Sequence, residues 1–393
     1  MIKIFVFSPF ALENGRGGEI SSMELASGLQ TYFDVEFMDT NIISSEKLLS
    51  KEVIRNKLKG VNYIGKMNLL SYSIFDKIFT LPNPYEILKL LRIVKRNDIV
   101  YFSIFNFKNV LTFAFLSLIC RRTQFIIGYR KPLHSEKIIS LYNLKYRLSL
   151  LVLSLFKKRF NHHALSNNAK VFLTKFYDKT KVFHIIHGIK LDDYEGDNFS
   201  KKNSKLLNFV YIGYLDDVHK GIGILLKALD EFLTENQNLK VRFEFCGMGP
   251  LEPQLKAIEE KYPDFIKFNG YISNEIISDY YKKNDVYLFT SRSEPFPRVL
   301  MEALASNELV ICSKTIGSNE LLNGKNFAFF IEDLTSELIQ EKMLEIYNLW
   351  NSRPEEFKQL QDSAKKFVFD NYSFSKELEM FKELIDKISK NKC

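Results

Sequence analysis

The sequence predicts an α/β protein made of two domains, each built on a parallel sheet. The chain has 393 residues, which is more than one typical domain core holds. In both halves, short apolar runs typical of buried strands alternate with helical patterns. The alternation restarts after a polar run at 192–205, which we interpret as a linker between the domains. Because ligands of such folds bind at the carboxyl ends of strands, two facing sheets imply a site in the cleft between them.

The chain opens with a predicted strand over 2–8, a loop over 9–18 that is rich in glycine, and a helix over 20–29. This order of elements is typical of a Rossmann-like unit. The loop has neither the Gly-x-Gly-x-x-Gly of dinucleotide sites nor the Gly-Lys-Ser/Thr of triphosphate loops. Neither of those ligands is therefore indicated.

The same alternation continues to about residue 190, where we place the end of the first domain. Apolar runs predict strands at 35–38, 98–102, 124–128, 164–165 and 181–186. Helical patterns cover 110–120 and a long amphipathic stretch at 138–160, so His162 and His163 are expected at a helix end. Residues 44–96 carry mixed signals and give no order of elements.

The second domain is predicted to cover residues 191–372. Its expected strands are 207–212, 241–246, 266–268, 285–289 and 309–312. Its expected helices are 221–233, one that ends near Tyr262, 299–305, and further helices over 336–390.

Cysteine usage and the termini point to a cytoplasmic protein. Cys120, Cys246, Cys312 and Cys393 are scattered, with no metal-binding spacing, which is typical of buried thiols in a reducing compartment. The first residues lack the basic start and long apolar run of a signal peptide. We expect no metal site, because the histidines at 162, 163 and 187 have no third ligand in view and no Asp-x-Asp is present.

Charge is distributed unevenly along the chain. Residues 1–190 hold 29 Lys and Arg against 13 Asp and Glu, whereas the remaining residues hold 26 against 34. A basic half favours contact with an anionic partner such as a membrane or a nucleic acid, and the alternative is a solvated basic face. The apolar stretches 110–120 and 148–156 are each closed by Arg or Lys and are too short to span a bilayer, which favours peripheral membrane contact. No nucleic-acid-binding motif is present, so we expect no such partner.

The stretch 291–305 contains two carboxylates, Glu294 and Glu302, at the start of an apolar, Ala-rich helix. We expect Ser293 to cap this helix, Glu294 to lie exposed at its mouth, and Glu302 to lie two turns further in. A helix mouth presents unpaired N–H groups and the positive dipole end, which suit a phosphate. The carboxylates would then hold sugar or ribose hydroxyls.

This spacing resembles the Glu-x7-Glu signature of retaining glycosyltransferases of family 4, which have the GT-B fold of two Rossmann-like domains whose parallel sheets face each other across a cleft. The resemblance covers roughly residues 207–325 in four ordered segments. The first three segments are Val210-Tyr-Ile-Gly-Tyr-Leu-Asp-Asp-Val-His-Lys-Gly221, Phe245-Cys-Gly-Met-Gly-Pro250 and Phe268-Asn-Gly-Tyr-Ile272. The fourth is the Glu-x7-Glu stretch, which is followed by Ile316-Gly-Ser-Asn-Glu-Leu-Leu322. It also implies that a last helix, about 373–393, crosses back onto the first domain.

The resemblance implies a role for each matching residue. Lys220 falls on the family lysine that grips the donor diphosphate, Glu302 on the ligand of the ribose hydroxyls, and Glu294 beside the transferred sugar. The remaining donor-side positions are Phe296, Pro297 and Arg298, whose backbone would meet the distal phosphate or sugar, Gly247 and Gly249 in a close turn, and Ile272 near the base.

Two donor-side residues depart from the family pattern. Tyr214 stands where the family usually has arginine, which removes a cation that Arg298 or Arg292 would have to replace. Pro295 stands where glycine is common and has no N–H to donate.

The first domain matches the family at fewer positions. Gly17 and Gly18 resemble the family's N-terminal Gly-Gly loop beside the phosphates and the acceptor. His134 is the nearest match to a family histidine but comes several residues late, and Tyr129 or Arg130 are alternatives at that position.

The resemblance thus implies a retaining, metal-independent glycosyltransferase without a cofactor. Its donor would be a UDP- or GDP-linked sugar. Its acceptor would be a hydroxyl of a glycan or lipid-linked glycan in bacterial surface polysaccharide or glycolipid synthesis, at the inner face of the cell membrane or in solution. The alternatives are a nucleotide-sugar epimerase or phosphorylase of the same fold, and a degenerate, non-catalytic binding module.

Overall fold

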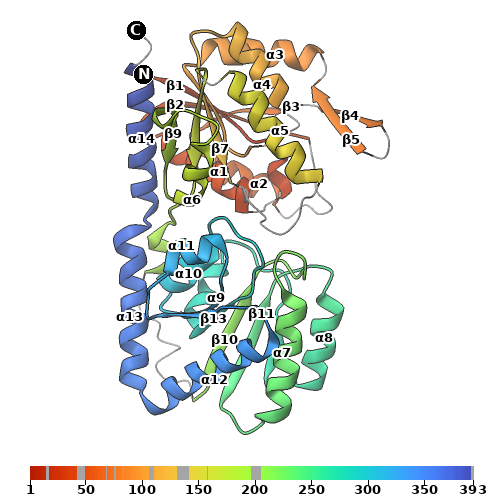
Figure 1. Ribbon diagram of the computed structural model, residues 1–393, viewed down its shortest axis with the longest axis vertical. Helices are drawn as coiled ribbons and strands as arrows, with labels where there is room; N and C mark the ends of the chain where they lie inside the picture. The colour runs from red at the N-terminus through yellow and green to blue at the C-terminus, as the bar shows by residue number, and fades with distance from the viewer. Residues whose placement is uncertain are drawn as a thin grey trace. The chain divides into compact units, whose positions relative to one another are not determined.

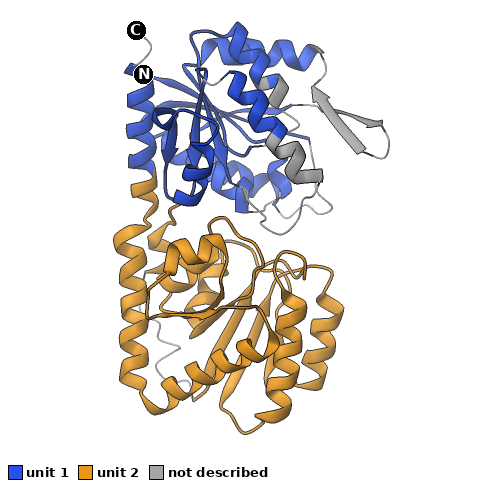
Figure 2. Cartoon of the chain, viewed as in Figure 1, with its two compact units in different colours: residues 1–186, 378–393 blue, residues 187–377 orange. Residues whose placement is uncertain are grey.

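The computed structural model of the protein describes residues 1–14, 17–41, 49–67, 69–74, 77–82, 84–105, 110–130, 141–156, 158–195 and 205–390. It divides into two compact units (Figure 2). Unit 1 consists of Met1–Ile186 with Leu378–Cys393, and unit 2 consists of His187–Glu377.

Unit 1 is built on a parallel sheet whose described strands follow the order β3-β2-β1-β6-β7-β8-β9 (Figure 1). The chain thus starts in the middle, runs to one edge and then returns to build the other side, as in doubly wound folds. The strands are β1 Lys3–Phe7, β2 Asp34–Thr40, β3 Asn62–Met67, β6 Ile99–Phe102, β7 Gln124–Tyr129, β8 Phe160–Ala164 and β9 Val182–His184.

Helices connect these strands and pack against the sheet (Figure 1). They are α1 Gly17–Leu29, α2 Lys51–Lys57, α3 Pro84–Arg96, α4 Val110–Ile119, α5 Leu141–Leu155 and α6 Asn167–Leu173, with short 3-10 turns at Leu12–Asn14 and Lys179–Lys181. The stretch whose order the sequence left open holds α2, β3, α3 and an antiparallel hairpin of β4 Leu69–Ile74 and β5 Lys77–Pro82. Among the described residues, no helix is both long and apolar enough to cross a membrane.

The helix predicted over 138–160 is present as α5, but its predicted end and the placement of the histidines there were wrong. The helix α5 stops at Leu155, and His162 and His163 lie in the buried strand β8. Tyr129 hydrogen-bonds to His162 Nδ1 at 2.9 Å, and burial lowers the pKa of His162 to about 3. The imidazole is therefore neutral and fills the core, and two adjacent histidines gave no strand signal in the sequence.

Unit 2 repeats this architecture with a parallel sheet whose described strands follow the order β12-β11-β10-β13-β14-β15 (Figure 1). The strands are β10 Leu207–Ile212, β11 Val241–Cys246, β12 Ile266–Phe268, β13 Val286–Phe289, β14 Leu309–Ser313 and β15 Ala328–Ile331. The helices are α7 Ile222–Glu235, α8 Glu252–Lys261, α9 Ile277–Lys283, α10 Arg298–Ala305, α11 Ile316–Leu322, α12 Ser336–Ser352 and α13 Pro354–Asn371, and the last helix, α14 Phe374–Lys390, begins in this unit. A 3-10 turn at Leu191–Tyr194 precedes them. Because all strands of the sheet are parallel, the loops that follow them meet at one edge.

The last helix passes from unit 2 into unit 1. At its start, the N–H of Phe374 donates to the carbonyl of Ile189 at 2.8 Å, and the N–H of Gly188 donates to Glu377 Oε2 at 2.9 Å. A Cβ on Gly188 would lie 2.4 Å from the carbonyl oxygen of Ser373, so only glycine fits there. From Leu378 onward the helix belongs to unit 1, where the ring of Phe381 packs against Tyr101.

One buried carboxyl group of unit 1 titrates outside its usual range. Asp39, at the end of β2, accepts hydrogen bonds from the N–H of Leu12 at 2.9 Å and from the hydroxyl of Tyr63 at 2.7 Å. Burial raises the pKa of Asp39 to about 6, against the lowering effect of these hydrogen bonds. Because the folded-state pKa exceeds the unfolded one, the folded state binds this proton more tightly. The resulting stabilisation is complete below about pH 4 and is lost as the pH rises through about 6.

Replacing Asp39 by asparagine should remove this pH dependence while keeping a similar shape. We expect the free energy of unfolding of Asp39→Asn, relative to the unmodified chain, to rise by about 2–3 kcal/mol between pH 4 and pH 7. Urea unfolding at several pH values measures it. The control is Asp34→Asn, a half-exposed carboxylate at the start of the same strand. A difference that does not change with pH would contradict the assignment.

Candidate functional site

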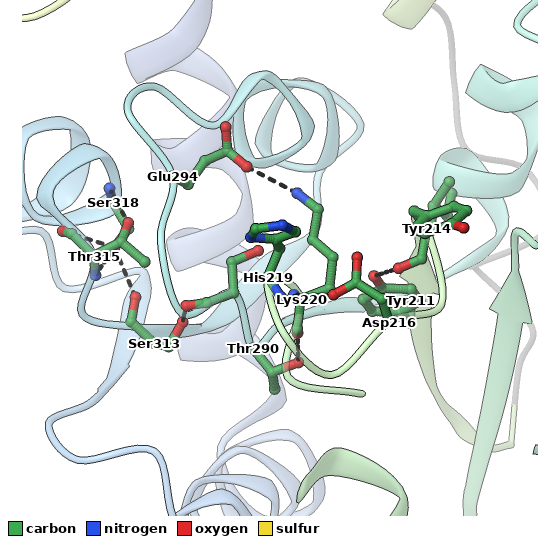
Figure 3. A network of polar contacts seen from close by, with 12 residues as sticks. Tyr211, Tyr214, Asp216, His219, Lys220, Thr290, Glu294, Ser313, Thr315 and Ser318 are labelled. Atoms are coloured by element: carbon green, nitrogen blue, oxygen red, sulfur yellow. Dashed lines mark hydrogen bonds and ion pairs between the residues drawn. The ribbon is translucent and has the colours of Figure 1, made fainter. Parts of the chain in front are cut away.

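The loops that follow β10 and β13 are joined at the carboxyl edge of the unit 2 sheet (Figure 3). Asp216 accepts hydrogen bonds from the backbone N–H groups of His219 at 2.6 Å and Lys220 at 3.2 Å. Thr290 Oγ1 donates to the carbonyl of Lys220 at 2.9 Å, and the N–H of Arg292 donates to the carbonyl of His219 at 2.8 Å. These contacts hold the Lys220 backbone in one place.

The loop after β14 joins the same edge. Ser318 Oγ donates to the carbonyl of Ser313 at 2.7 Å, and Ser313 Oγ donates to the carbonyl of Ser291 at 2.6 Å (Figure 3). The N–H of Gly317 donates to the carbonyl of Glu294 at 3.0 Å. A Cβ on Gly317 would lie only 2.6 Å from that oxygen, so this close approach requires glycine.

Lys220 and Glu294 form an ion pair at this edge, with Nζ 2.8 Å from Oε2 (Figure 3). The side chain of Lys220 is 26% exposed and that of Glu294 is 23% exposed. An ion pair that water reaches is worth about 1 kcal/mol or less. An anionic ligand can therefore take the place of Glu294 beside the ammonium group at little cost.

Glu302 is held from two sides. Its Oε1 accepts a hydrogen bond from Arg298 Nε at 2.7 Å, one turn earlier on α10. Its Oε2 accepts one from the hydroxyl of Tyr281 at 3.2 Å. Burial, and then the charge of Glu302, raise the pKa of Tyr281 well above its ordinary value, so the tyrosine stays protonated and donates. The carboxylate is thus oriented, and it keeps acceptor capacity for further hydroxyls.

The predicted cap of this helix was wrong. Helix α10 begins at Arg298 after Pro297, without a side-chain cap, so Ser293 lies five residues before the first helical residue. Proline at 295 and 297 disfavours helical dihedrals in the residue before it, which delays the helix start. Glu294 consequently lies in the loop, and Glu302 lies in the second turn of the helix.

The predicted glycine turn after β11 is explained by backbone contacts. Gly247 and Gly249 have φ values of 149° and 154°. A Cβ on Gly249 would lie 2.5 Å from the carbonyl oxygen of Leu215, and one on Gly247 would collide with the carbonyl oxygen of Gly213. The glycines therefore let this turn rest on the loop that follows β10. Ile272, the residue predicted to lie near the base, is buried.

The predicted substitutes for the family arginine both have partners. Tyr214, which occupies its position, is 45% exposed. Arg292 Nε donates to the backbone carbonyl of Asp217 at 2.9 Å, and Arg292 Nη2 donates to the carboxylate of Asp217 at 3.2 Å. Arg298 is committed to Glu302. Phe296 is buried and packs against the ring of Tyr372, so its side chain serves the fold.

Three residues of this network were missed by the sequence analysis. Asp216 and Asp217 lie inside the motif Val210–Gly221, and carboxylates in the loop after an apolar strand are a signal that could have been used. Tyr281 lies 21 residues before Glu302 in another helix, α9, and has no motif of its own. Only the fold brings it to the site.

In unit 1, Gly17 and Gly18 are the first residues of α1 rather than loop residues. A Cβ on Gly18 would lie 2.8 Å from Ile104 Cδ1, whereas Gly17 faces open space. Of the two alternatives to His134, Tyr129 is the last residue of β7 and is buried in the core, and Arg130 hydrogen-bonds to Ser21 of α1. His134 lies outside the described residues.

Within the part of the chain that the structure describes, no three His, Cys, Asp or Glu side chains form a cluster suited to a metal ion.

Removing the hydroxyl of Tyr281 should leave one oxygen of the buried Glu302 carboxylate without that donor. We expect Tyr281→Phe to lower the free energy of unfolding by about 1–3 kcal/mol, measured by urea unfolding. Tyr280→Phe, the neighbouring tyrosine on the same helix, is the control and should change little. Equal stability of the two variants would contradict the proposed support of Glu302.

Comparison with protein families matches residues 207–348 to a model described as glycosyl transferases group 1. A subunit of phosphatidylinositol N-acetylglucosaminyltransferase from Schizosaccharomyces pombe is 32% identical over 125 residues, which cover 31% of this chain and 27% of the relative. A glycogen synthase from Thermodesulfovibrio yellowstonii is 22% identical over 170 residues, which cover 42% of this chain and 33% of the relative. The chain thus aligns with a third or less of these two relatives.

Solved structures are similar to this chain over almost its whole length. The crystal structure of Anabaena Alr3699/HepE in complex with UDP has a TM-score of 0.74 at 16% identity, covering 98% of this chain and 100% of that one. The same protein in complex with UDP-glucose has a TM-score of 0.72. At this identity the similarity establishes the fold. Residues 207–348 therefore match the glycosyl transferases group 1 family, and the whole chain has the GT-B fold of two Rossmann-like domains.

Proposed function

We propose that this protein is a retaining glycosyltransferase that moves a sugar from a nucleotide-diphosphate donor to a hydroxyl group of an acceptor. The observation that carries the proposal is the exchangeable Lys220–Glu294 ion pair at the carboxyl edge of the unit 2 sheet, together with Glu302 on α10, which Arg298 and Tyr281 hold. A cation for phosphate and a fixed carboxylate for hydroxyls are the two groups that a nucleotide sugar needs. The family match over 207–348 supports the same assignment.

In this proposal unit 2 is the donor side of the enzyme and unit 1 the acceptor side. Glu302 accepts hydrogen bonds from the ribose hydroxyls, and Glu294 lies beside the transferred sugar. Lys220 leaves Glu294 and pairs with the donor diphosphate. Gly247, Gly249 and Ile272 line the donor site through the turns they form. On the acceptor side, the start of α1 at Gly17 and Gly18 borders the acceptor.

The transfer breaks the bond between the anomeric carbon and the diphosphate oxygen. It forms a bond from that carbon to the acceptor oxygen on the same face. The acceptor proton passes to the departing phosphate, which takes the bonding electron pair. Lys220 stabilises the charge that develops on this leaving group, because an ammonium beside a phosphate offsets it directly. No protein nucleophile, metal ion or cofactor takes part in the proposed step.

For the donor base we propose uracil, since the Anabaena protein with the same fold was solved with UDP and with UDP-glucose. A GDP-linked sugar is the alternative. For the acceptor we propose a glycan or lipid-linked glycan of bacterial surface polysaccharide or glycolipid synthesis, used at the inner face of the cell membrane. The excess of Lys and Arg in residues 1–190 supports that placement.

A binding module without catalysis is the second candidate. The exposed Tyr214 in place of an arginine favours it, because one of two expected phosphate ligands is lost. Such a module would bind a nucleotide yet release no sugar from any donor.

Calorimetry against UDP and GDP tests donor binding. Lys220→Ala removes a charge-assisted contact to phosphate, so we expect binding about ten- to a hundredfold weaker. Glu302→Ala should weaken nucleotide binding to a similar degree. Lys227→Ala, an exposed lysine on α7, is the control and should bind normally. If neither nucleotide binds the unmodified chain, the proposed function is wrong.

Product analysis tests the reaction itself. In a hydrolysis and transfer screen over UDP- and GDP-linked sugars, we expect one donor to be consumed and the anomeric configuration of its sugar to be retained in the transfer product, as read by NMR. Excess EDTA should leave the rate unchanged. Binding without any sugar release would favour the binding module, and an isomerised nucleotide sugar would indicate an epimerase.

A further inference from the structure

A pocket of about 570 Å³ opens at the amino-terminal edge of the unit 1 sheet, the edge opposite to the loops that follow its strands. Five cations dominate its lining, which consists of Asp98, Arg121, Arg122, Gln124, Lys158, Arg159, Lys181 and Ile388. They come from the segments that enter β7, β8 and β9. We call Arg121, Arg122, Lys158, Arg159 and Lys181 the basic cluster.

The charge of the basic cluster is not neutralised by ion pairs. Within the described ranges of the chain, none of its five members has a carboxylate within ion-pair distance. The lining carboxylate, Asp98, accepts a hydrogen bond from the backbone N–H of Lys3 at 2.9 Å. Burial, and then the charge of Arg121, lower the pKa of Arg159, which is the expected effect of neighbouring cations.

An apolar face adjoins the basic cluster on α4 and α5. Helix α4 exposes Phe115, Leu118 and Ile119, at positions i, i+3 and i+4, and α5 exposes Leu148, Leu151 and Leu155, at i, i+3 and i+7. Each set therefore lies on one side of its helix. Leu155 is 81% exposed and the other five between 42% and 53%. The two helices pack side by side (Figure 1), and we call the six exposed side chains on them the apolar face.

Arg159 fixes the apolar face against the basic cluster. Its guanidinium donates to the carbonyls of Ser117 at 3.0 Å, Cys120 at 2.9 Å and Arg121 at 2.9 Å, all at the end of α4. The chain just after α5 is thereby tied to the end of α4. Ile119 and Leu155 end their helices only two or three residues before Arg121 and Lys158.

Apolar side chains bordered by unpaired cations match an anionic lipid surface. The leucines can enter the boundary between headgroups and acyl chains, while the cations bind lipid phosphates. A second copy of the chain fits less well, because a twofold contact on this face would bring two basic clusters close together. The chemistry of the face therefore selects the bilayer over self-association.

We propose that unit 1 docks on an anionic lipid bilayer through the apolar face of α4 and α5, with the basic cluster binding lipid phosphate groups. This names the partner of the acceptor side in the proposed function. Binding to vesicles needs neither donor nor acceptor, so it can be tested separately from the transfer reaction.

Co-sedimentation of the full chain with vesicles tests the proposal. In about 0.1 M salt, binding should be strong to phosphatidylcholine vesicles that contain phosphatidylglycerol and weak to phosphatidylcholine alone. The triple variant Arg121→Gln, Arg122→Gln, Lys158→Gln should bind about a hundredfold more weakly, at about fivefold for each charge. Arg159 stays unchanged because it holds the end of α4.

Two further variants separate location from net charge. Lys51→Gln, Arg55→Gln, Lys59→Gln removes three exposed cations around α2 and should bind normally. Leu151→Ser, Leu155→Ser keeps every charge and should bind about tenfold more weakly, because exposed leucines lose their insertion into lipid. All variants replace exposed side chains, and thermal unfolding checks that they remain folded.

Three results would overturn the proposal. The first is absence of binding to anionic vesicles, and the second is equal weakening by the two charge triples. The third is a dimer, seen by light scattering, that the leucine substitutions dissociate. Calorimetry with UDP on the same preparations reads the donor site independently, so a failed docking surface is distinguishable from a failed transferase assignment.

Discussion

The ion pair between Lys220 and Glu294 is the interaction on which the candidate site depends. It bridges the loop after β10 and the loop after β13, at an edge where the loop after β14 also arrives. Both side chains remain partly exposed, so the pair is weak and its partners can separate. Without a ligand it satisfies two opposite charges. With an anionic ligand bound, Lys220 would pair with the ligand, and the Glu294 carboxylate would be available to other groups.

Glu302 is held more firmly than Glu294. It is almost buried, and its two oxygens have separate donors, Arg298 on the same helix and Tyr281 on α9. Such a group keeps its position, because moving it would leave a buried charge without partners. One signature carboxylate is thus exchangeable and the other fixed. In the proposed function, the exchangeable Glu294 lies beside the sugar that is transferred, and the fixed Glu302 binds the ribose, which stays on the nucleotide.

Much of the fold was predictable from the sequence, and the exceptions have physical causes. Apolar runs such as Leu207–Ile212 and Gln124–Tyr129 are buried on both faces of a parallel sheet, so their composition alone identifies them. The histidines of β8 were placed at a helix end because two adjacent polar residues gave no strand signal. In the structure, tyrosine hydroxyls form hydrogen bonds with both imidazoles inside the core. Ser293 was wrongly expected to cap α10, because the two prolines after it outweigh the preference of serine for a cap. The support of Glu302 by Tyr281 depends on tertiary packing, which no local pattern reports.

The central claim is that the carboxyl edge of the unit 2 sheet binds a nucleotide diphosphate. Hydrogen–deuterium exchange of the full chain, with and without saturating UDP or GDP, tests it most directly. The account predicts that one of the two nucleotides slows exchange in the loop 214–221 and in the segment 290–302. No slowing with either nucleotide, or slowing confined to unit 1, would contradict it.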